Sequence, residues 1–386
     1  MNIIWSAHQV GIIIFLFVIL IITLTNIKIL GNLGRYPMPS RFPRVSVMVP
    51  ARNEEDNIRS CVESLLAQYY PDFQVIVLDD NSTDRTWKIL SELAEENDKL
   101  KIFKGEPLPA GWLGKNWACH QLSQKADGDI FLFTDADTQH HPDLIRDGVA
   151  AMRAKNADLL TAFPCEKVVT WGERLMVPLF PWFIIGFLPL VIAYKTNSPT
   201  LSAAIGQFMM FKRKAYERIE GHKALKNNVV DDVQLARNIK EAGLRWRMVN
   251  GKDRIGCRMY HSFQEAYNGF TKNLFAGFGY KIIKFIFVWL WIGFMFLQPL
   301  ILIILKLLGI DFPMYTMDLA GVAVFLAFMI WLASNWCFRF PLYLALLYPV
   351  NMVLILSIAF GSLTFALTGQ ANWKGRTFAR HEIKWW

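Results

Sequence analysis

Two short acidic clusters carry the residue types that could hold a metal ion and a diphosphate. LDDNSTD includes Asp80, and TDADT includes Asp135 and Asp137; each cluster directly follows an apolar run. Carboxylates at positions i and i+2 of an extended strand end point to the same side, where they would repel and raise each other's pKa. A divalent cation that binds one carboxylate and two phosphate oxygens removes this repulsion, which suits Mg²⁺ or Mn²⁺. TDADT therefore predicts a metal site, with a surface turn of incidental acids as the alternative.

Three further positions could take part in the same chemistry. Asp80 could accept a hydrogen bond from the imide of uracil, although DDNSTD also has the composition of a helix cap. Asp231 and Asp232 open a predicted helix, and two adjacent acids exceed what a cap requires, so one could be a general base for an acceptor hydroxyl. Lys115 follows the GWLG loop at a helix start, where it would oppose the helix dipole. A contact with a diphosphate would explain this unfavourable position, and a solvated lysine is the alternative.

The elements that must position these residues alternate along the middle of the chain. Short apolar runs rich in β-branched residues alternate with segments of helical periodicity, such as Ile58, Val62, Leu65 and Leu66. This rhythm predicts right-handed βαβ units and a mainly parallel sheet, in which ligands bind outside the carboxyl ends of the strands. The predicted strands are 45–49, 74–78, 101–103, 130–134, 158–163, 204–211 and 245–249.

Both ends of the chain predict membrane segments. The chain has 386 residues, 53% of them hydrophobic, with a mean hydropathy of +0.26, which is too apolar for one ordinary soluble domain. Residues 10–30 are long enough to cross a bilayer, and they lack the basic start and small-residue cleavage site of a signal peptide. Residues 285–307, 317–337 and 341–366 repeat this pattern, and Pro341 and Pro349 predict that the last segment is re-entrant or split.

The apolar stretch 174–194 contains three prolines and is predicted to be an interfacial segment with Trp182 and Tyr194 at headgroup level. An irregular buried segment is the alternative. The basic residues that follow the first apolar run place the intervening domain in the cytoplasm. The formal charge of +9 fits a domain beside an anionic leaflet. Dispersed basic residues without a reading motif argue against nucleic acid, and five cysteines without CxxC spacing predict reduced thiols.

Seven motifs occur in an order that resembles glycosyltransferase family 2, which has the GT-A fold. They are VPARNE, DDNSTD, GWLGKNWA, TDADT, GQFMMF with a following GH, DDVQLA and RMYHSFQEAYNGFTKN. The similarity is greatest to the membrane-embedded lipid branch, that is, carotenoid-acid glycosyltransferases of the staphyloxanthin pathway type and hopanoid-associated glycosyltransferases. NWKGRTF in the tail is similar to a motif of ceramide glucosyltransferases.

The resemblance implies a role for each matching residue. Pro50, Ala51, Arg52 and Glu54 would wrap the uridine, Asp80 would contact uracil, and Lys115 and Asp135 would complete donor binding. Asp137 would bind the divalent cation. Asp232, adjacent to Asp231, would be the catalytic base. Lys272, Trp373 and Arg376 would contact the acceptor or a phosphate.

One departure from the family pattern indicates whether the enzyme would be processive. Many members carry a Gln-x-x-Arg-Trp signature after the base, whereas FQEAYNGFTKN contains neither the arginine nor the tryptophan. The resemblance therefore predicts a non-processive enzyme, which transfers a hexose from a nucleotide-sugar donor to a lipid such as a carotenoid acid or hopanoid. The alternatives are a polyprenyl-phosphate or glycolipid glycosyltransferase, a tethered enzyme with a soluble acceptor, and a non-catalytic nucleotide-sugar-binding protein.

The expected organisation has four parts in a multi-pass protein of the cell membrane. They are a transmembrane anchor at 1–34, a cytoplasmic α/β domain of GT-A type at 35–280, transmembrane helices at 281–370 and a basic cytoplasmic tail at 371–386. Nothing in the sequence sets an oligomeric state.

Overall fold

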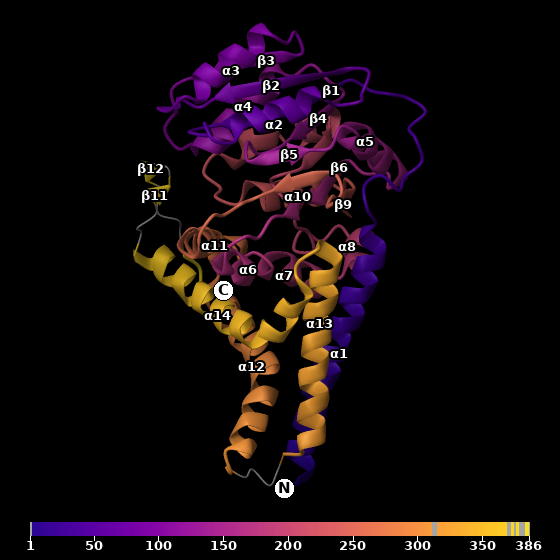
Figure 1. Ribbon diagram of the computed structural model, residues 1–386, viewed down its shortest axis with the longest axis vertical. Helices are drawn as coiled ribbons and strands as arrows, with labels where there is room; N and C mark the ends of the chain where they lie inside the picture. The colour runs from indigo at the N-terminus through magenta and orange to yellow at the C-terminus, as the bar shows by residue number, and fades with distance from the viewer. Residues whose placement is uncertain (1, 311–314, 369–371, 374–375, 378–382, 386) are drawn as a thin grey trace. The chain divides into compact units, whose positions relative to one another are not determined.

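The computed structural model describes residues 2–310, 315–368, 372–373, 376–377 and 383–385, which form two compact units (Figure 1). The sheet unit comprises Leu30–Lys167 and Leu190–Met259, and the helical unit comprises Met1–Ile29, Val168–Pro189 and Tyr260–Trp386. Segment 168–189 and the chain from residue 260 thus group with the apolar helices, whereas the expected α/β domain ran from 35 to 280.

The sheet unit is built on a seven-stranded mixed sheet. Its strands, in spatial order, are β3 (Leu100–Lys104), β2 (Phe73–Asp79), β1 (Val45–Ala51), β4 (Ile130–Phe133), β8 (Met209–Lys212), β6 (Leu159–Phe163) and β9 (Trp246–Asn250). All neighbouring pairs are parallel except those made by β8, which is antiparallel to both β4 and β6. The predicted mainly parallel α/β fold is confirmed. The predicted strand 204–211 forms only from Met209, because residues 202–208 run as an irregular segment beside the ends of β4 and β6.

Alternation along the strands explains how helices cover the two faces of this sheet. Val45, Val47 and Val49 share one apolar cluster with residues of α2, α3 and α5, whereas α4 contacts β1 and β2 from the opposite face. The helices of the unit are α2 (Ile58–Leu66), α3 (Thr86–Glu95), α4 (Gly114–Lys125), α5 (Leu144–Ala154), α8 (Leu190–Lys195), α9 (Arg213–Arg218), the 3₁₀ turn η1 (Gly221–Leu225) and α10 (Asp231–Glu241).

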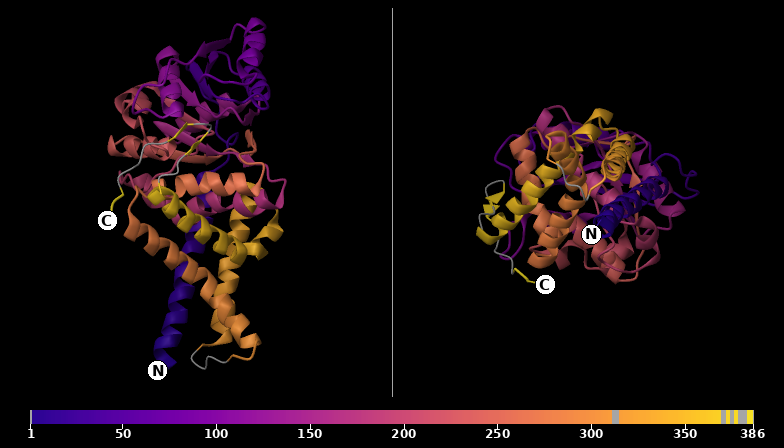
Figure 2. Two further views of the ribbon diagram at one scale, coloured as in Figure 1. Left: turned by 90° about the vertical axis from the view of Figure 1, so that its left-hand side faces the viewer. Right: turned by 90° about the horizontal axis from the view of Figure 1, so that it is seen from below.

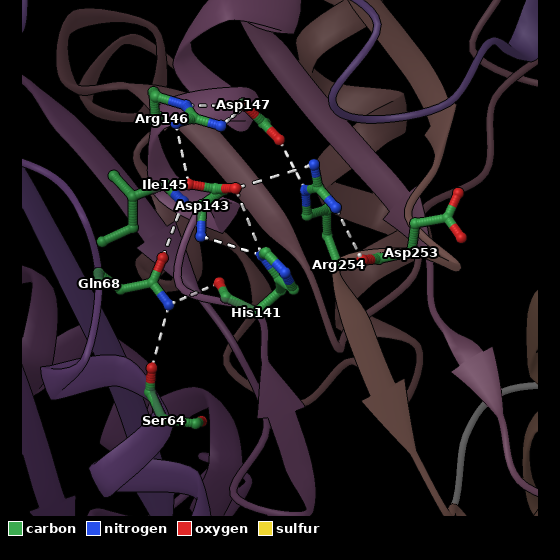
Figure 3. A network of polar contacts seen from close by, with 9 residues as sticks. All are labelled: Ser64, Gln68, His141, Asp143, Ile145, Arg146, Asp147, Asp253 and Arg254. Atoms are coloured by element: carbon green, nitrogen blue, oxygen red, sulfur yellow. Dashed lines mark hydrogen bonds and ion pairs between the residues drawn. The ribbon is translucent and has the colours of Figure 1, made fainter.

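A small second sheet continues from the carboxyl end of β4. It has the order β5 (Thr138–His140), β10 (Ile255–Cys257), β7 (Cys165–Glu166). A polar network braces the chain on either side of it (Figure 3). Gln68 donates to the carbonyl oxygen of His141 (2.8 Å) and accepts from the amide of Ile145 (3.0 Å). Arg254, which precedes β10, donates to the carboxylate of Asp147 on α5 (2.6 Å). The chain after TDADT is therefore fixed to α2, α5 and β10.

Among the residues that the structure describes, four helices are long and apolar enough to span a membrane: Ala7–Leu30, Ile282–Leu307, Met317–Phe338 and Leu342–Thr368, which belong to the helical unit apart from Leu30. These confirm one N-terminal and three C-terminal apolar segments. The elements of the helical unit are α1 (Asn2–Leu30), α6 (Trp171–Met176), α7 (Leu179–Phe187), α11 (Phe263–Gly277), α12 (Ile282–Leu307), α13 (Met317–Phe338), the 3₁₀ turn η2 (Leu342–Leu347), α14 (Tyr348–Thr368) and the two-residue strands β11 (Asn372–Trp373) and β12 (Arg376–Thr377). The last apolar segment is split near Pro349 into η2 and α14, and α14 lies oblique to α13 (Figures 1 and 2).

The stretch 174–194 contains the end of α6, the whole of α7 and most of α8. The side chain of Trp182, on α7, is completely buried and stacks on Trp331 with ring centroids 4.6 Å apart. Tyr194, on α8, belongs to the sheet unit, where its hydroxyl accepts from the amide of Met248 (3.0 Å) and donates to the carbonyl of the same residue (3.3 Å). Burial against protein does not set the depth of a residue in a bilayer, so the headgroup position of these two aromatic residues stays a prediction.

We predict that Gly128→Ala destabilises the sheet unit. A Cβ at this position would lie 2.7 Å from the amide nitrogen of Ser46 and 2.9 Å from the carbonyl oxygen of Arg44, so the backbone of β1 would have to shift. Overpacking of this kind costs about 1–3 kcal/mol of unfolding free energy, measurable as a lower thermal unfolding midpoint of the detergent-solubilised protein. Gly256→Ala is the control, because a Cβ there meets nothing within 4 Å. Equal midpoints for the two variants would contradict the prediction.

Candidate functional site

The ends of β1 and β2 form a cross-linked pair of loops. The amide of Asp80 donates to the carbonyl of Ala51 (2.7 Å), and the guanidinium of Arg52 donates to the carbonyl of Asp80 (2.7 Å). Arg52 Nη1 also lies 3.9 Å from the carboxylate of Asp80, which is 4% exposed. Pro50, Ala51, Arg52 and Asp80, chosen from two separate motifs, are thus brought together at one edge of the sheet.

Asn53 joins these two loops by hydrogen bonds. Its backbone lies in the left-handed region (φ 53°), a conformation that asparagine tolerates better than most residues. Its amide donates to the hydroxyl of Ser82 (2.9 Å), and its side-chain oxygen accepts from the amide of Thr83 (2.8 Å). The next amide, that of Glu54, donates to the hydroxyl of Thr86 (2.8 Å). Backbone amides after each strand are therefore satisfied by side-chain oxygens of the segment that follows the other strand.

A charged cluster lies at the carboxyl end of β4. The ammonium of Lys115, on α4, lies 2.7 Å from the carboxylate of Asp135. Although burial lowers the pKa of Lys115, Asp135 and Asp231 raise it well above its usual value. Three side chains of this cluster lie close to Gly206. A Cβ built on Gly206 would lie 3.3 Å from Asp135 Oδ2, 3.5 Å from Lys115 Nζ and 3.8 Å from Asp232 Oδ2. Lys115, Asp135 and Asp232, which are distant in sequence, therefore converge on one small volume.

The paired acids at the start of α10 have opposite electrostatic character. Burial and the charge of Asp231 raise the pKa of Asp232 to about 7. Although burial raises the pKa of Asp231, Lys115 and His222 lower it to about 2. Asp231 is therefore the permanent anion of the pair at neutral pH. Asp232 is poised to take or release a proton, which is the property expected of a general base.

The imidazole of His222 lies between the hydroxyl of Tyr216 and the carboxylate of Asp231. The imidazole of His222 is completely buried, with Nδ1 2.8 Å from the hydroxyl of Tyr216 and Nε2 3.6 Å from the carboxylate of Asp231. If Nδ1 accepts from Tyr216, the proton of the neutral ring is on Nε2 and faces the carboxylate. Sequence reasoning noted the GH motif but gave His222 no role, because only the fold brings it to Asp231.

Asp137 has the character of an incomplete cation site. Its Oδ1 is buried without a hydrogen-bond partner, as is Oε2 of Glu166 on β7. Burial, Asp135 and Glu54 raise the pKa of Asp137 to about 7, and burial and Asp137 raise that of Glu166 to about 8. Unpartnered carboxylate oxygens in a negative environment fit a hard divalent cation. Among the residues that the structure describes, no group of three or more His, Cys, Asp or Glu side chains could hold a metal ion by itself.

A neutral polar cluster supports the turn that carries Asp135 and Asp137. His140 Nε2 lies 3.1 Å from the hydroxyls of both Thr134 and Thr138. Thr138 donates to the carbonyl of Asp135 (2.6 Å), and Thr134 donates to the carbonyl of Gln207 (2.7 Å). Burial lowers the pKa of His140 to about 3, so the ring is uncharged at neutral pH. This cluster was missed in the sequence, where Thr134 and Thr138 only flank the acids.

The three residues implied for the acceptor side do not belong to the sheet unit. Lys272 lies on α11 of the helical unit. Trp373 and Arg376 lie on β11 and β12, and their side chains are outside the described part of the structure. The remaining candidates, from Pro50 to Asp232, all lie in the sheet unit.

Comparison with known proteins identifies one matching family and several similar sequences. Residues 46–220 match the family model of glycosyl transferase family 2. A 4,4'-diaponeurosporenoate glycosyltransferase from Staphylococcus haemolyticus is 26% identical over 238 residues, which are 60% of this chain and 61% of that protein. A beta-monoglucosyldiacylglycerol synthase from Nostoc sp. is 32% identical over 184 residues, 44% of this chain and 38% of that protein. The chain thus spans less than two thirds of each of these relatives.

The fold is also found in a solved structure. The mannosyltransferase PcManGT from Pyrobaculum calidifontis, solved with GDP-Man and Mn²⁺, aligns over 96% of this chain and 98% of its own, with a TM-score of 0.53 and 17% identity. The fold is therefore GT-A-like, as the resemblance implied.

Proposed function

Because residues 46–220 match the family model of glycosyl transferase family 2, we propose that this chain is an inverting hexosyltransferase with a nucleotide-sugar donor and a lipid acceptor. The observation that carries the proposal is the convergence of Lys115, Asp135 and Asp232 around Gly206. A cation, a hydrogen-bond acceptor and a proton acceptor on one small volume are what transfer from a diphosphate to a hydroxyl requires.

The donor would lie along the edge of the sheet from β2 to β4. Asp80 would accept from the imide of uracil, and Pro50, Ala51, Arg52 and Glu54 would surround the uridine. Asp135 would contact the ribose and sugar, and Lys115 would contact the diphosphate. A UDP-hexose fits these roles. The fold neighbour crystallised with GDP-Man makes a guanosine donor the alternative.

Transfer would be a single displacement. Asp232 would take the proton of the acceptor hydroxyl while its oxygen attacks the anomeric carbon on the face opposite the diphosphate. The bond between the anomeric carbon and the phosphate oxygen would break, and Lys115 would stabilise the negative charge on the departing diphosphate. With a carboxylic acid as acceptor, Asp232 would instead hold the acid in line. Asp137, with its unpartnered oxygen, would bind Mg²⁺ or Mn²⁺, which supplies further charge stabilisation when bound.

Two independent observations support a lipid acceptor. The names of the two relatives specify 4,4'-diaponeurosporenoate as the compound glycosylated and monoglucosyldiacylglycerol as the product, and four helices in the described part of the chain are long and apolar enough to span a bilayer. The basic residues after α1 favour a cytoplasmic catalytic domain in the cell membrane. In this arrangement the acceptor need not leave the bilayer, and Lys272, Trp373 and Arg376 would meet its headgroup. A tethered enzyme with a soluble acceptor and transfer to polyprenyl phosphate are the alternatives.

The test is a donor panel. Membranes that contain the full-length protein are incubated with radiolabelled UDP-glucose, UDP-galactose, UDP-N-acetylglucosamine and GDP-mannose, and the lipid extract is analysed for label. We expect label from one UDP-hexose in the lipid fraction. A labelled water-soluble product that is distinct from the donor and its hydrolysis products would favour a soluble acceptor, and no labelled transfer product with any donor would contradict the proposal.

In the same assay, Asp232→Asn should lower the rate by about 10²–10⁴-fold, which is the usual contribution of a general base. Its affinity for UDP should stay close to that of the wild type, because Asp232 contacts the reacting end of the donor. Glu241→Gln, at the other end of α10, is the control and should retain wild-type rates. Activity of Asp232→Asn at the wild-type level would remove Asp232 as the base.

The rate should depend on pH through Asp232. Its pKa of about 7 in the folded protein means that the ionised, proton-accepting form is lost as the pH falls below 7. The initial rate at saturating donor and Mn²⁺ should therefore fall on the acid side of neutrality. Asp231→Asn removes the negative neighbour and should lower the pKa of Asp232, which moves this acid limb to lower pH. An acid limb at the same pH in both proteins would contradict the assignment.

Asp137→Asn should weaken Mn²⁺ binding in the presence of UDP by about tenfold or more, because a neutral amide is a poorer ligand for a hard cation. Free Mn²⁺ is measured by electron paramagnetic resonance, which does not depend on turnover. Asp72→Asn, at a half-exposed surface acid, is the control. Unchanged Mn²⁺ affinity in Asp137→Asn would place the metal elsewhere.

A further inference from the structure

Gly206 lies within the charged cluster, and the missing Cβ leaves open a position 3.3–3.8 Å from three charged groups. We propose that one edge of the hexose ring of the donor lies in this space, against the Cα of Gly206, and that Gly206 is a specificity-determining residue for an uncharged hexose. This inference rests on the proposed function and adds the sugar class and the residue that makes room for it.

The backbone conformation does not require glycine at this position. Gly206 does not have a positive φ, unlike Gly221 or Gly243. Packing does not require it either, because the nearest atom to an added Cβ is a carboxylate oxygen at 3.3 Å, and nothing lies closer than 3.0 Å. At Gly128, by contrast, an added Cβ would lie 2.7 Å from a backbone nitrogen. The atoms that a side chain at 206 would meet are those of Asp135, Lys115 and Asp232, the groups assigned to the donor and to catalysis.

The segment cannot move aside to admit a side chain, because both neighbours of Gly206 are anchored. The amide of Ile205 donates to the hydroxyl of Thr161 on β6 (2.9 Å). The carbonyl of Gln207 accepts from the hydroxyl of Thr134 at the end of β4 (2.7 Å). Ile205 is 2% exposed and Gln207 is 7% exposed. A larger residue would therefore project over the charged cluster instead of being accommodated by the backbone.

The charges around this space indicate the class of sugar. Asp135 and Asp232 face it at the distances given above, Asp231 lies beside Asp232, and Lys115 is the cation of the cluster. Carboxylates accept hydrogen bonds from sugar hydroxyls. A carboxylate on the sugar would bring a further negative charge close to three acids, which is unfavourable at a partly buried site. A neutral hexose is therefore favoured over a uronic acid.

The experiment compares the affinities of UDP and UDP-sugars for the full-length protein in detergent with Mn²⁺, by isothermal titration calorimetry. The ligands are UDP, UDP-glucose, UDP-galactose, UDP-N-acetylglucosamine and UDP-glucuronate. The measured quantity is the Kd of each UDP-sugar divided by the Kd of UDP for the same protein, which separates the sugar contact from the nucleotide contact.

For the uncharged UDP-hexose that the wild type binds with the lowest Kd, we expect this ratio to rise by about tenfold or more in Gly206→Val and by less in Gly206→Ala, as overpacking would produce. The Kd of UDP alone should remain close to the wild-type value in both variants. UDP-glucuronate should bind wild-type protein more weakly than that hexose. Gly256→Val, on strand β10 where an added Cβ meets nothing within 4 Å, should leave every ratio unchanged.

The outcomes separate this inference from the proposed function. If the wild type binds neither UDP nor any UDP-hexose, the proposed donor is wrong. If UDP binds but the ratio is unchanged in Gly206→Val, or if UDP itself weakens as much as the UDP-hexose, the hexose does not occupy this space and the inference is overturned. Equal affinity for UDP-glucuronate and the neutral hexose would overturn the selection by charge.

Discussion

The candidate site depends on one partly buried cation among several carboxylates. Lys115 pairs with Asp135 at 2.7 Å and also lowers the pKa of Asp231. Bringing Asp135, Asp231 and Asp232 together without this ammonium would place three anions in a poorly solvated volume, which is strongly unfavourable. Lys115 therefore allows the strand end and the helix start to approach each other. The unfavourable position of a lysine at a helix start has its explanation in this pairing.

The charges around the site give the two neighbouring acids Asp231 and Asp232 different pKa values. Asp231 lies near Lys115 and His222 and remains ionised, whereas burial and the charge of Asp231 raise the pKa of Asp232 to about 7. The pattern resembles other enzymes in which paired carboxylates are driven to different pKa values by their surroundings. The ionised carboxylate of Asp231 thus raises the pKa of Asp232.

The sequence allowed the fold class and much of the site to be predicted, because both depend on local patterns. Apolar runs followed by acids identify strand ends, and parallel strand ends meet at one edge, so the approach of Asp80 to Arg52 and of Asp135 to Lys115 could be expected. His140, Glu166, His222 and Gly206 could not be found in this way. Their roles depend on which strand of the second sheet or which irregular segment lies against the acids, and that is set by long-range packing. The stacking of Trp182 on Trp331 could not be predicted for a related reason, since the two residues are distant in sequence.

The reciprocal hydrogen bonds between the loops after β1 and β2 have a consequence for association. The amides of Asn53 and Glu54 are already bonded to Ser82 and Thr86, and the amide of Asp80 to Ala51. An arriving base would thus encounter a rigid rim, and little chain entropy would be lost in shaping it. Recognition of the proposed nucleotide at this edge would accordingly be of the lock-and-key kind, with the selectivity set by the shape of the rim.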